Sequence, residues 1–207
     1  MESIILASES QRRQEYFELL GLPFTCVPSM IDESLIEGIS IENAVEDLAR
    51  RKVRKVVEIL KDTPPLWVAG ADTVIAISEN PDEKTDEKSN EKIFGKPADR
   101  EDARRMLSIF QGRTHSVITA LALYNGRKKT VDSQSVTSYV TLAKLSPGEI
   151  EWYLDSGEWQ GAAGAYKIQG LASCFITEIK GSFSSIVGLP LREFYAMLRD
   201  NGYPYGG

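Results

Sequence analysis

The chain has little cysteine and histidine: its 207 residues include two cysteines, Cys26 and Cys174, and one histidine, His115. Two thiols cannot form a disulfide framework, so we expect both to be reduced thiols in the core. One histidine excludes a metal site built from several imidazoles, and no sequence signature ties it to a nucleophile. We therefore predict that His115 is a structural residue of a strand.

Long apolar runs are also missing. No segment approaches the length of a membrane span, and the N-terminal residues lack the basic flank and apolar run of a signal peptide. The net charge of −6 gives the molecule no global attraction for nucleic acid. We therefore expect a cytoplasmic protein with neither nucleic acid nor membrane as a partner, in which local basic groups hold any anionic ligand.

The sequence does contain short apolar runs that alternate with helical patterns. Apolar runs predict strands at 3–8, 24–29, 66–77, 114–124, 130–142 and 173–179. Helical spacing and capping residues predict helices at 11–20, 40–61, 99–110 and 146–157, and a last one from Pro190 to about residue 201. Asn125-Gly126 predicts a hairpin, and the polar segment 78–93 predicts an exposed loop or hairpin tip. This order predicts an α/β fold with a mixed, twisted sheet flanked by helices.

Two arginines lie where a helix start disfavours them. Arg12 and Arg13 fall in the first turn of the helix 11–20, just after Ser8 and the expected N-cap Ser10. The helix dipole is positive there and favours anions. The arginines are either solvated charges on an exposed face or, with the hydroxyls and free N–H groups, a phosphate site. The convergence of these groups on one loop favours the phosphate site.

An aspartate interrupts an apolar strand. Asp72 stands in the sequence AGADTVIAI, where a carboxylate is costly to bury without partners. It is either bonded to local backbone beside Gly70, or it holds a divalent cation or takes a proton from water. Glu33 is a candidate for a second carboxylate, and its neighbour Asp32 is the competing choice.

Two further segments offer ligand-binding groups. Lys96 lies in the rigid turn Gly-Lys-Pro, which can present an ammonium group to a phosphate. Lys52 is one of several cations in ARRKVRK and by itself indicates nothing. The Gly/Ala-rich segment 161–170 permits close backbone approach, with Tyr166 offering an aromatic face and Gln169 an amide able to read a base edge.

Taken together, these segments resemble the Maf family of nucleoside triphosphate pyrophosphatases. The matches occur in order along nearly the whole chain, and five in register are specific although each alone is weak. They are LASESQRRQEYFELLGLPF, GADTVI, GKPADREDARRML, GAYKIQG and GSFSSIVGLPL.

The resemblance implies an activity, a fold and a set of partners. Maf proteins hydrolyse a nucleoside triphosphate to the monophosphate and pyrophosphate with a divalent metal, here Mg²⁺ or Mn²⁺. It implies one domain, residues 1–207, with two lobes around a nucleotide cleft, similar to inosine-triphosphate pyrophosphatases, and a homodimer. AGAYKIQG resembles the subfamily that acts on dTTP and UTP rather than on 7-methyl-GTP.

The resemblance also implies roles for single residues. The position of Asp72 is that of the catalytic base, and Glu33 assists it at the metal. Base selection is associated with the positions of Arg12, Thr73 and Gln169. Phosphates are held by the basic residues Arg12, Arg13, Lys52 and Lys96.

The sequence departs from the family at two places. Gln11 replaces the proline of Ser-Pro-Arg-Arg, which costs little because proline there only pre-organises the helix. Gly161 and Ala162 replace an Asp-Lys pair before AGAY, which bears on base preference more than on reaction type. Two alternatives to a dTTP/UTP pyrophosphatase stay open: a non-catalytic nucleotide-binding regulator of cell division or septum formation, and a purine house-cleaning enzyme acting on ITP or XTP.

Overall fold

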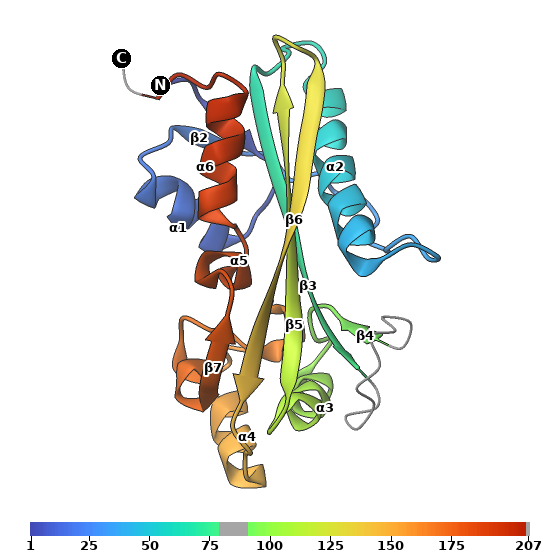
Figure 1. Ribbon diagram of the computed structural model, residues 1–207, viewed down its shortest axis with the longest axis vertical. Helices are drawn as coiled ribbons and strands as arrows, with labels where there is room; N and C mark the ends of the chain where they lie inside the picture. The colour runs from blue at the N-terminus through green and yellow to red at the C-terminus, as the bar shows by residue number, and fades with distance from the viewer. Residues whose placement is uncertain (79–90, 206–207) are drawn as a thin grey trace. The chain divides into compact units, whose positions relative to one another are not determined.

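The computed structural model describes residues 1–78 and 91–205, and Figure 1 shows their arrangement. The strands are β1 (Ile4–Leu6), β2 (Phe24–Cys26), β3 (Trp67–Ser78), β4 (Glu91–Phe94), β5 (Thr114–Asn125), β6 (Thr130–Leu142) and β7 (Ile176–Lys180). The α-helices are α1 (Gln11–Leu19), α2 (Ile41–Ile59), α3 (Arg100–Phe110), α4 (Pro147–Asp155), α5 (Phe183–Val187) and α6 (Leu191–Asp200). Two 3₁₀ helices complete the list, η2 (Ala163–Ala165) and η3 (Leu171–Phe175).

The strands form one mixed sheet, as predicted. Their order is β2-β1-β3-β5-β6-β7, and β4 pairs with β3 off this path. β1 runs parallel to β2 and β3, whereas β4 and β7 run antiparallel to their partners. The long strands are visibly twisted, and helices flank them (Figure 1). None of the helices in the described ranges combines the length and apolar character needed to cross a bilayer.

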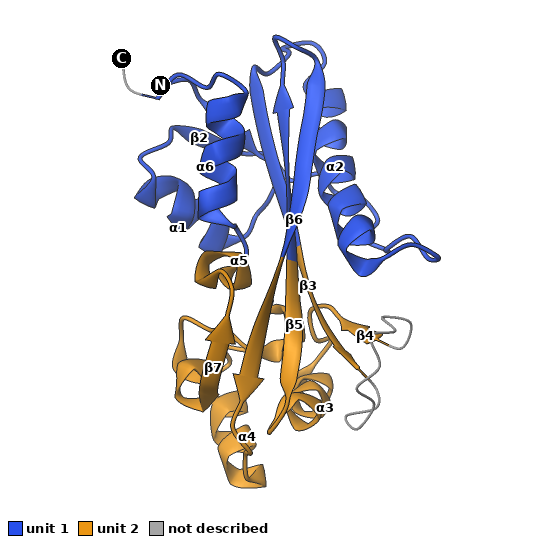
Figure 2. Ribbon diagram, in the orientation of Figure 1, with its two compact units in different colours: residues 1–72, 119–136, 188–207 blue, residues 73–118, 137–187 orange. Residues whose placement is uncertain are grey.

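The chain divides into two compact units, coloured separately in Figure 2. β3, β5 and β6 each contribute residues to both. Unit 1 comprises residues 1–72, 119–136 and 188–207, and unit 2 comprises residues 73–118 and 137–187.

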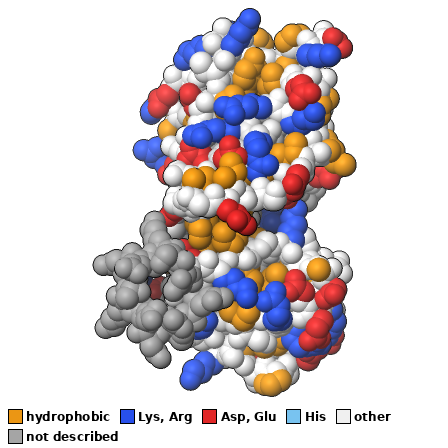
Figure 3. Space-filling model, turned by 90° about the vertical axis from the view of Figure 1, so that its right-hand side faces the viewer, with side chains coloured by type: hydrophobic (Ala, Val, Ile, Leu, Met, Phe, Trp, Pro, Cys, Tyr) orange, Lys and Arg blue, Asp and Glu red, His pale blue; other side chains and the backbone are white. Residues whose placement is uncertain are grey.

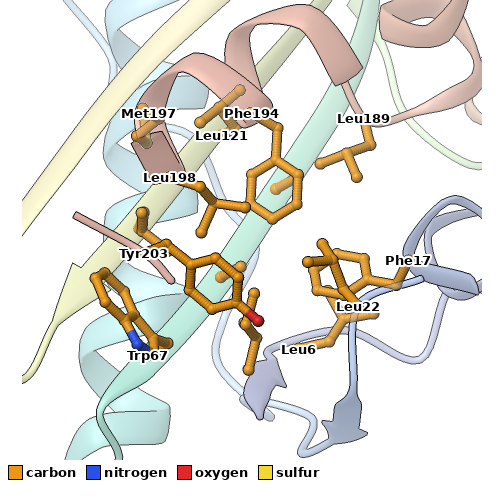
Figure 4. Close-up of a cluster of buried hydrophobic side chains, with 14 residues drawn as sticks. Leu6, Phe17, Leu22, Trp67, Leu121, Leu189, Phe194, Met197, Leu198 and Tyr203 are labelled. Carbon is orange, nitrogen blue, oxygen red and sulfur yellow. The ribbon is translucent and has the colours of Figure 1, made fainter. Parts of the chain in front are cut away.

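Unit 1 is built around a core on one face of β3. Trp67, Ala69 and Ala71 alternate along this strand and belong to a buried cluster that includes Phe17 of α1 and Phe194 of α6 (Figure 4). The Phe17 and Phe194 ring centroids are 5.2 Å apart. Because side chains alternate along a strand, the residues between these three face the other side, where α2 packs.

Unit 2 has a second core between α3 and the sheet. The aromatic ring of Phe110 lies 5.0 Å from that of Phe94 and 4.8 Å from that of His115, between centroids. α3 is joined to α4 by ion pairs from Arg100 and Arg104 to Glu151. These contacts fix the scaffold from which the segment 161–170 emerges.

Most predicted helix starts are confirmed in detail. The side chains of Ser40 and Asp99 accept hydrogen bonds from Asn43 N and Asp102 N, and Ser146 forms a capping box with Glu149. Ser10 occupies the N-cap position of α1, but its hydroxyl makes no cap hydrogen bond. The N-cap position predicted for Ser10 is therefore confirmed, but its side chain does not cap the helix.

Other expectations are corrected. Of the segment 78–93, predicted as an exposed loop or hairpin tip, Ser78 ends β3 and residues 91–93 belong to β4, which pairs antiparallel with β3, while residues 79–90 lie outside the described ranges. Residues 173–175 belong to η3, so the last strand begins only at Ile176, and α5 was not predicted. Both cysteines are free, but Cys174 is exposed and is therefore not a core thiol.

Candidate active site

The charged centre of unit 1 is a lysine between two carboxylates. Lys52 Nζ lies 2.6 Å from Asp72 Oδ1 and 2.8 Å from Glu33 Oε1. The Lys52 and Asp72 side chains are only 6% and 12% exposed, whereas that of Glu33 is 54% exposed. The structure thus brings together three predicted site residues, with Lys52, which only the family resemblance singled out, between the other two.

A glycine explains how the lysine reaches the aspartate. Gly70 and Asp72 share the face of β3 that α2 covers, because they are two residues apart on a strand. A Cβ added at Gly70 would lie 2.8 Å from Val53 Cγ2 and 3.4 Å from the Ala49 carbonyl oxygen of α2. This close approach of helix to strand lets the Lys52 side chain end at the carboxylate of Asp72.

The structure separates the two competing carboxylates of the 30–34 segment. Asp32 accepts hydrogen bonds from the N–H and hydroxyl of Ser34, at 2.9 and 2.8 Å, and these bonds lower its pKa. Glu33 instead meets Lys52. Of the two carboxylates, Glu33 is the one that belongs to the cluster.

Arg51 holds the backbone around Glu33 in place, a role that the sequence does not predict. Its guanidinium donates to the carbonyl oxygens of Asp32 and Ser34, at 3.0 and 2.6 Å, on either side of Glu33. It is held in turn by Asp47, one helical turn earlier, at 2.8 Å. These bonds join the irregular segment around Glu33 to α2. Because an irregular segment has no periodicity, the sequence contains no pattern that predicts these bonds.

Ser8 and Arg13 form a second part of the site in unit 1. The Ser8 hydroxyl accepts hydrogen bonds from Ser10 N at 3.2 Å and from an Arg13 terminal nitrogen at 3.0 Å. Arg13 Nε donates to the Gly188 carbonyl at 2.9 Å. Burial lowers the pKa of Arg13, opposed by the negative charge of Asp72. Arg13 is therefore a buried, positioned cation rather than a solvated surface charge.

Arg12, by contrast, is half-buried beside it. Its charge lowers the pKa of Arg13 further, after the effects of burial and Asp72. Two like charges thus adjoin at the start of α1, and an anion at this helix N-terminus would relieve their repulsion.

Unit 2 carries Thr73, Lys96 and Gln169. Thr73 follows Asp72 directly along β3 and is half-buried, while Lys96 and Gln169 are exposed. The turn of Lys96 is tied to the Gly/Ala-rich segment, because Gly164 N donates to the Gly95 carbonyl at 2.9 Å. The structure therefore links the segments of Lys96 and Gln169 within one unit.

The aromatic face expected of Tyr166 is absent. Tyr166 is 4% exposed, and its hydroxyl is 2.7 Å from His115 Nε2. Burial lowers the pKa of His115 to about 3 and raises that of Tyr166. Both groups are therefore neutral near pH 7 and anchor the segment, which agrees with the structural role predicted for His115.

The oxygen donors present fit a divalent metal that is coordinated partly by protein carboxylates and partly by the phosphates of a substrate. In the described ranges, no group of three or more His, Cys, Asp or Glu residues is arranged to hold a metal ion. Asp72 and Glu33 nevertheless converge on one point, now the Lys52 ammonium. Mg²⁺ typically takes one or two carboxylates and completes its shell with substrate phosphates and water.

The surface over α2 shows no patch of one charge sign. Figure 3 shows acidic and basic side chains interspersed on this face. The candidate groups for an anionic ligand in unit 1 are therefore local ones, Arg12, Arg13 and Lys52, which agrees with the net charge of −6.

These features define a mixed α/β protein with charged side chains gathered in unit 1. Arg12 and Arg13 lie at the start of α1, just after β1, and Asp72 lies in the middle of β3, where it pairs with Lys52. The particular family follows from comparison with known proteins. The model of the Maf-like protein family matches residues 3–201, so the chain belongs to the Maf family.

Relatives extend over nearly the full length of the chain. A dTTP/UTP pyrophosphatase of Symbiobacterium thermophilum is 38% identical over 204 residues, covering 99% of this chain and 96% of that protein. Another, of Desulforamulus reducens, is 41% identical over 200 residues, covering 96% of each. Among solved structures, the Staphylococcus aureus Ham1 protein gives a TM-score of 0.41 at 14% identity, covering 69% of this chain and 72% of that one.

Proposed function

We propose that this protein is a nucleoside triphosphate pyrophosphatase that hydrolyses dTTP and UTP to the monophosphate and pyrophosphate. The observation that carries the proposal is the buried Asp72 held by Lys52 beside Glu33. The names of full-length relatives at 38% and 41% identity support the reaction and the two substrates.

In the proposed reaction, Asp72 takes the proton of a water that attacks the α-phosphorus. The new bond joins the water oxygen to the α-phosphorus, the bond to the bridging oxygen of the β-phosphate breaks, and pyrophosphate leaves with that oxygen. Lys52 orients the carboxylate through its 2.6 Å contact. A positioned general base contributes about 10²- to 10⁴-fold to rate.

Asp72 and Glu33 are the residues that would hold Mg²⁺ or Mn²⁺, which would supply neutralisation of phosphate charge. Ser8, Ser10, Arg12, Arg13, Lys52 and Lys96 are proposed as phosphate contacts. For base selection we propose Arg12, Thr73 and Gln169. The two-lobed nucleotide cleft, the homodimer and the cytoplasmic location stay predictions.

The test is a panel of triphosphates with Mg²⁺ in which the released product is identified. Wild type is expected to release pyrophosphate from dTTP and UTP, and Asp72→Ala is expected to lose at least about 10²-fold in kcat. Asp32→Ala is the matched control, because the Asp32 carboxylate accepts hydrogen bonds from Ser34 in its own turn and has no role in the proposed reaction, so turnover should stay near wild type. Full turnover by Asp72→Ala, or orthophosphate as the first product, would overturn the assignment.

The same panel tests the alternatives. Tight binding of every triphosphate without turnover would favour the non-catalytic regulator, and ITP turnover far above UTP turnover would favour the purine enzyme. No feature of the described residues favours either one over the pyrophosphatase.

A further inference from the structure

A hydrogen-bonded clamp brackets Gln169 on both sides. Lys167 N, two residues before Gln169, donates to the Tyr153 hydroxyl at 3.3 Å, which in turn donates to Glu158 Oε1 at 3.3 Å. Leu171 N, two residues after Gln169, donates to Glu158 Oε2 at 2.9 Å. One carboxylate thus ties both ends of the turn that presents an exposed amide.

The clamp is closely fitted. A Cβ added at Gly170 would lie 2.3 to 2.5 Å from the three carboxylate atoms of Glu158, so the turn and the carboxylate are in direct contact. Tyr153 is fully buried on α4, and its ring lies 5.8 Å from that of Phe175 between centroids. One end of the turn is therefore held by Tyr153 of α4, and the other by Glu158 in the turn that follows α4.

The start of the same segment offers no substitute for this carboxylate. Gly161 and Ala162 carry no side chain able to form an ion pair, although they lie in the same Gly/Ala-rich segment. Bonds from backbone N–H groups to a carboxylate are charge-assisted and stronger than neutral ones. Glu158 thus supplies a strong anchor close to Gln169, while the Tyr166–His115 bond anchors the segment on its other side.

An amide that reads a base edge discriminates only when its orientation is fixed. A mobile amide can rotate to suit a wrong base, and a displacement of about 1 Å can cost about 10²-fold in efficiency. We propose that Glu158, acting with Tyr153, is a positioning residue for base selection that fixes the turn carrying Gln169. This inference rests on the proposed function and adds a residue to it.

The clamp itself is tested by amide hydrogen exchange, without any activity. In Glu158→Ala the amides of Lys167 and Leu171 are expected to exchange at least about tenfold faster than in wild type. The matched control is Glu151→Ala, which removes ion pairs with Arg100 and Arg104 in the same unit but touches neither amide. Unchanged exchange at both amides in Glu158→Ala would overturn the clamp.

Its role in selection is tested by kcat and KM for UTP, dTTP, CTP and ITP. Glu158→Ala is expected to lower the ratio of kcat/KM for UTP over CTP by about tenfold, with the loss mainly in KM. Glu158→Gln keeps one acceptor and should recover part of the ratio. Gln169→Ala should lower the same ratio, and the double variant should lower it no further, because both changes act through one amide.

A merely structural role gives a different result. If Glu158→Ala lowers turnover of all four nucleotides equally, as Glu151→Ala would through a smaller folded fraction, the proposal is overturned. A wild type that releases no pyrophosphate from any triphosphate overturns the proposed function instead. The exchange experiment then still decides whether Glu158 holds the turn.

Discussion

The two units present their candidate ligand groups in opposite ways. In unit 1, Arg13, Lys52 and Asp72 are buried charges that contact one another or the backbone. In unit 2, the exposed Lys96 and Gln169 stand on a scaffold of buried neutral groups. The first arrangement fixes charge at a point, whereas the second fixes the position of an otherwise ordinary surface side chain.

The difference has an energetic consequence. Removing one member of a buried ion pair leaves an uncompensated charge, which is strongly destabilising. Removing an exposed amide costs little stability, so its function is separable from folding. Substitutions of the buried charges in unit 1 should therefore change stability and activity together, whereas the exposed groups of unit 2 can be replaced with little change in stability.

Among the buried charges, the largest effect on stability is expected at Lys52. Lys52→Met leaves Asp72, only 12% exposed, without its ammonium partner and should lower the free energy of unfolding by about 3 kcal/mol. Urea unfolding measures the change. Lys55→Met is the control on the same helix: Lys55 is 39% exposed and pairs with Glu58, so the loss should stay below about 0.5 kcal/mol. Equal losses at both positions would show that the buried pair contributes nothing special.

The scaffold of unit 2 is tested by a pair of glycines. Gly164 and Gly161 have nearly the same φ, 67° and 68°, so alanine strains the backbone equally at both. Only at Gly164 would the Cβ also collide, 2.3 Å from Ile75 Cδ1 and 3.1 Å from Phe110 Cε2. Thermal and urea unfolding should show a loss of about 3 kcal/mol for Gly164→Ala but about 1 kcal/mol for Gly161→Ala. Comparable losses of stability in the two variants would mean that Ile75 and Phe110 move to accommodate the added methyl group at little cost.

His115 makes the scaffold sensitive to acid. Its native pKa of about 3 lies below the 6.5 of an exposed histidine, so between these pH values the unfolded chain binds a proton that the folded chain does not. This contribution is fully present above pH 6.5 and is lost as pH falls, by up to about 1.4 kcal/mol per unit. In His115→Gln, which does not titrate there, stability should fall less steeply from pH 6 to 4. Parallel stability–pH curves for the two proteins would contradict the pKa assignment.

Much of the fold can be predicted from the sequence, because local sequence signals agree with the tertiary structure. Ser146, Pro147 and Glu149 specify a helix start through chemistry within four residues, and the structure has that start. Asp72 can be recognised as a candidate site residue for a similar reason, since a buried carboxylate in an apolar strand requires a partner. Its pairing with Lys52 cannot be predicted from local pattern, because that contact depends on the close approach of α2 to β3 at Gly70.

The remaining features depend on long-range contacts that leave no local pattern. The sequence predicts an accessible aromatic face at Tyr166, but the ring is buried, and its hydroxyl contacts His115, 51 residues away. Arg51 and Glu158 bond backbone groups outside the α-helices and strands, where the sequence carries no periodic signal. The Maf resemblance supplied residue roles that composition could not, and those roles stay predictions.

The smallest effect distinguishes two N-cap positions, Asp99 of α3 and Ser10 of α1, that look alike in the sequence. The Asp99 carboxylate accepts from Asp102 N at 2.8 Å, so Asp99→Ala should cost about 1 kcal/mol of stability. Ser10 has the same position on α1 but makes no cap bond through its side chain, so Ser10→Ala should change stability by less than about 0.3 kcal/mol. If the Ser10 hydroxyl instead serves a phosphate, Ser10→Ala should raise KM for UTP while urea unfolding stays unchanged. A loss of stability as large as that of Asp99→Ala would return Ser10 to the role of a helix cap, and would leave the phosphate site to Ser8 and the arginines.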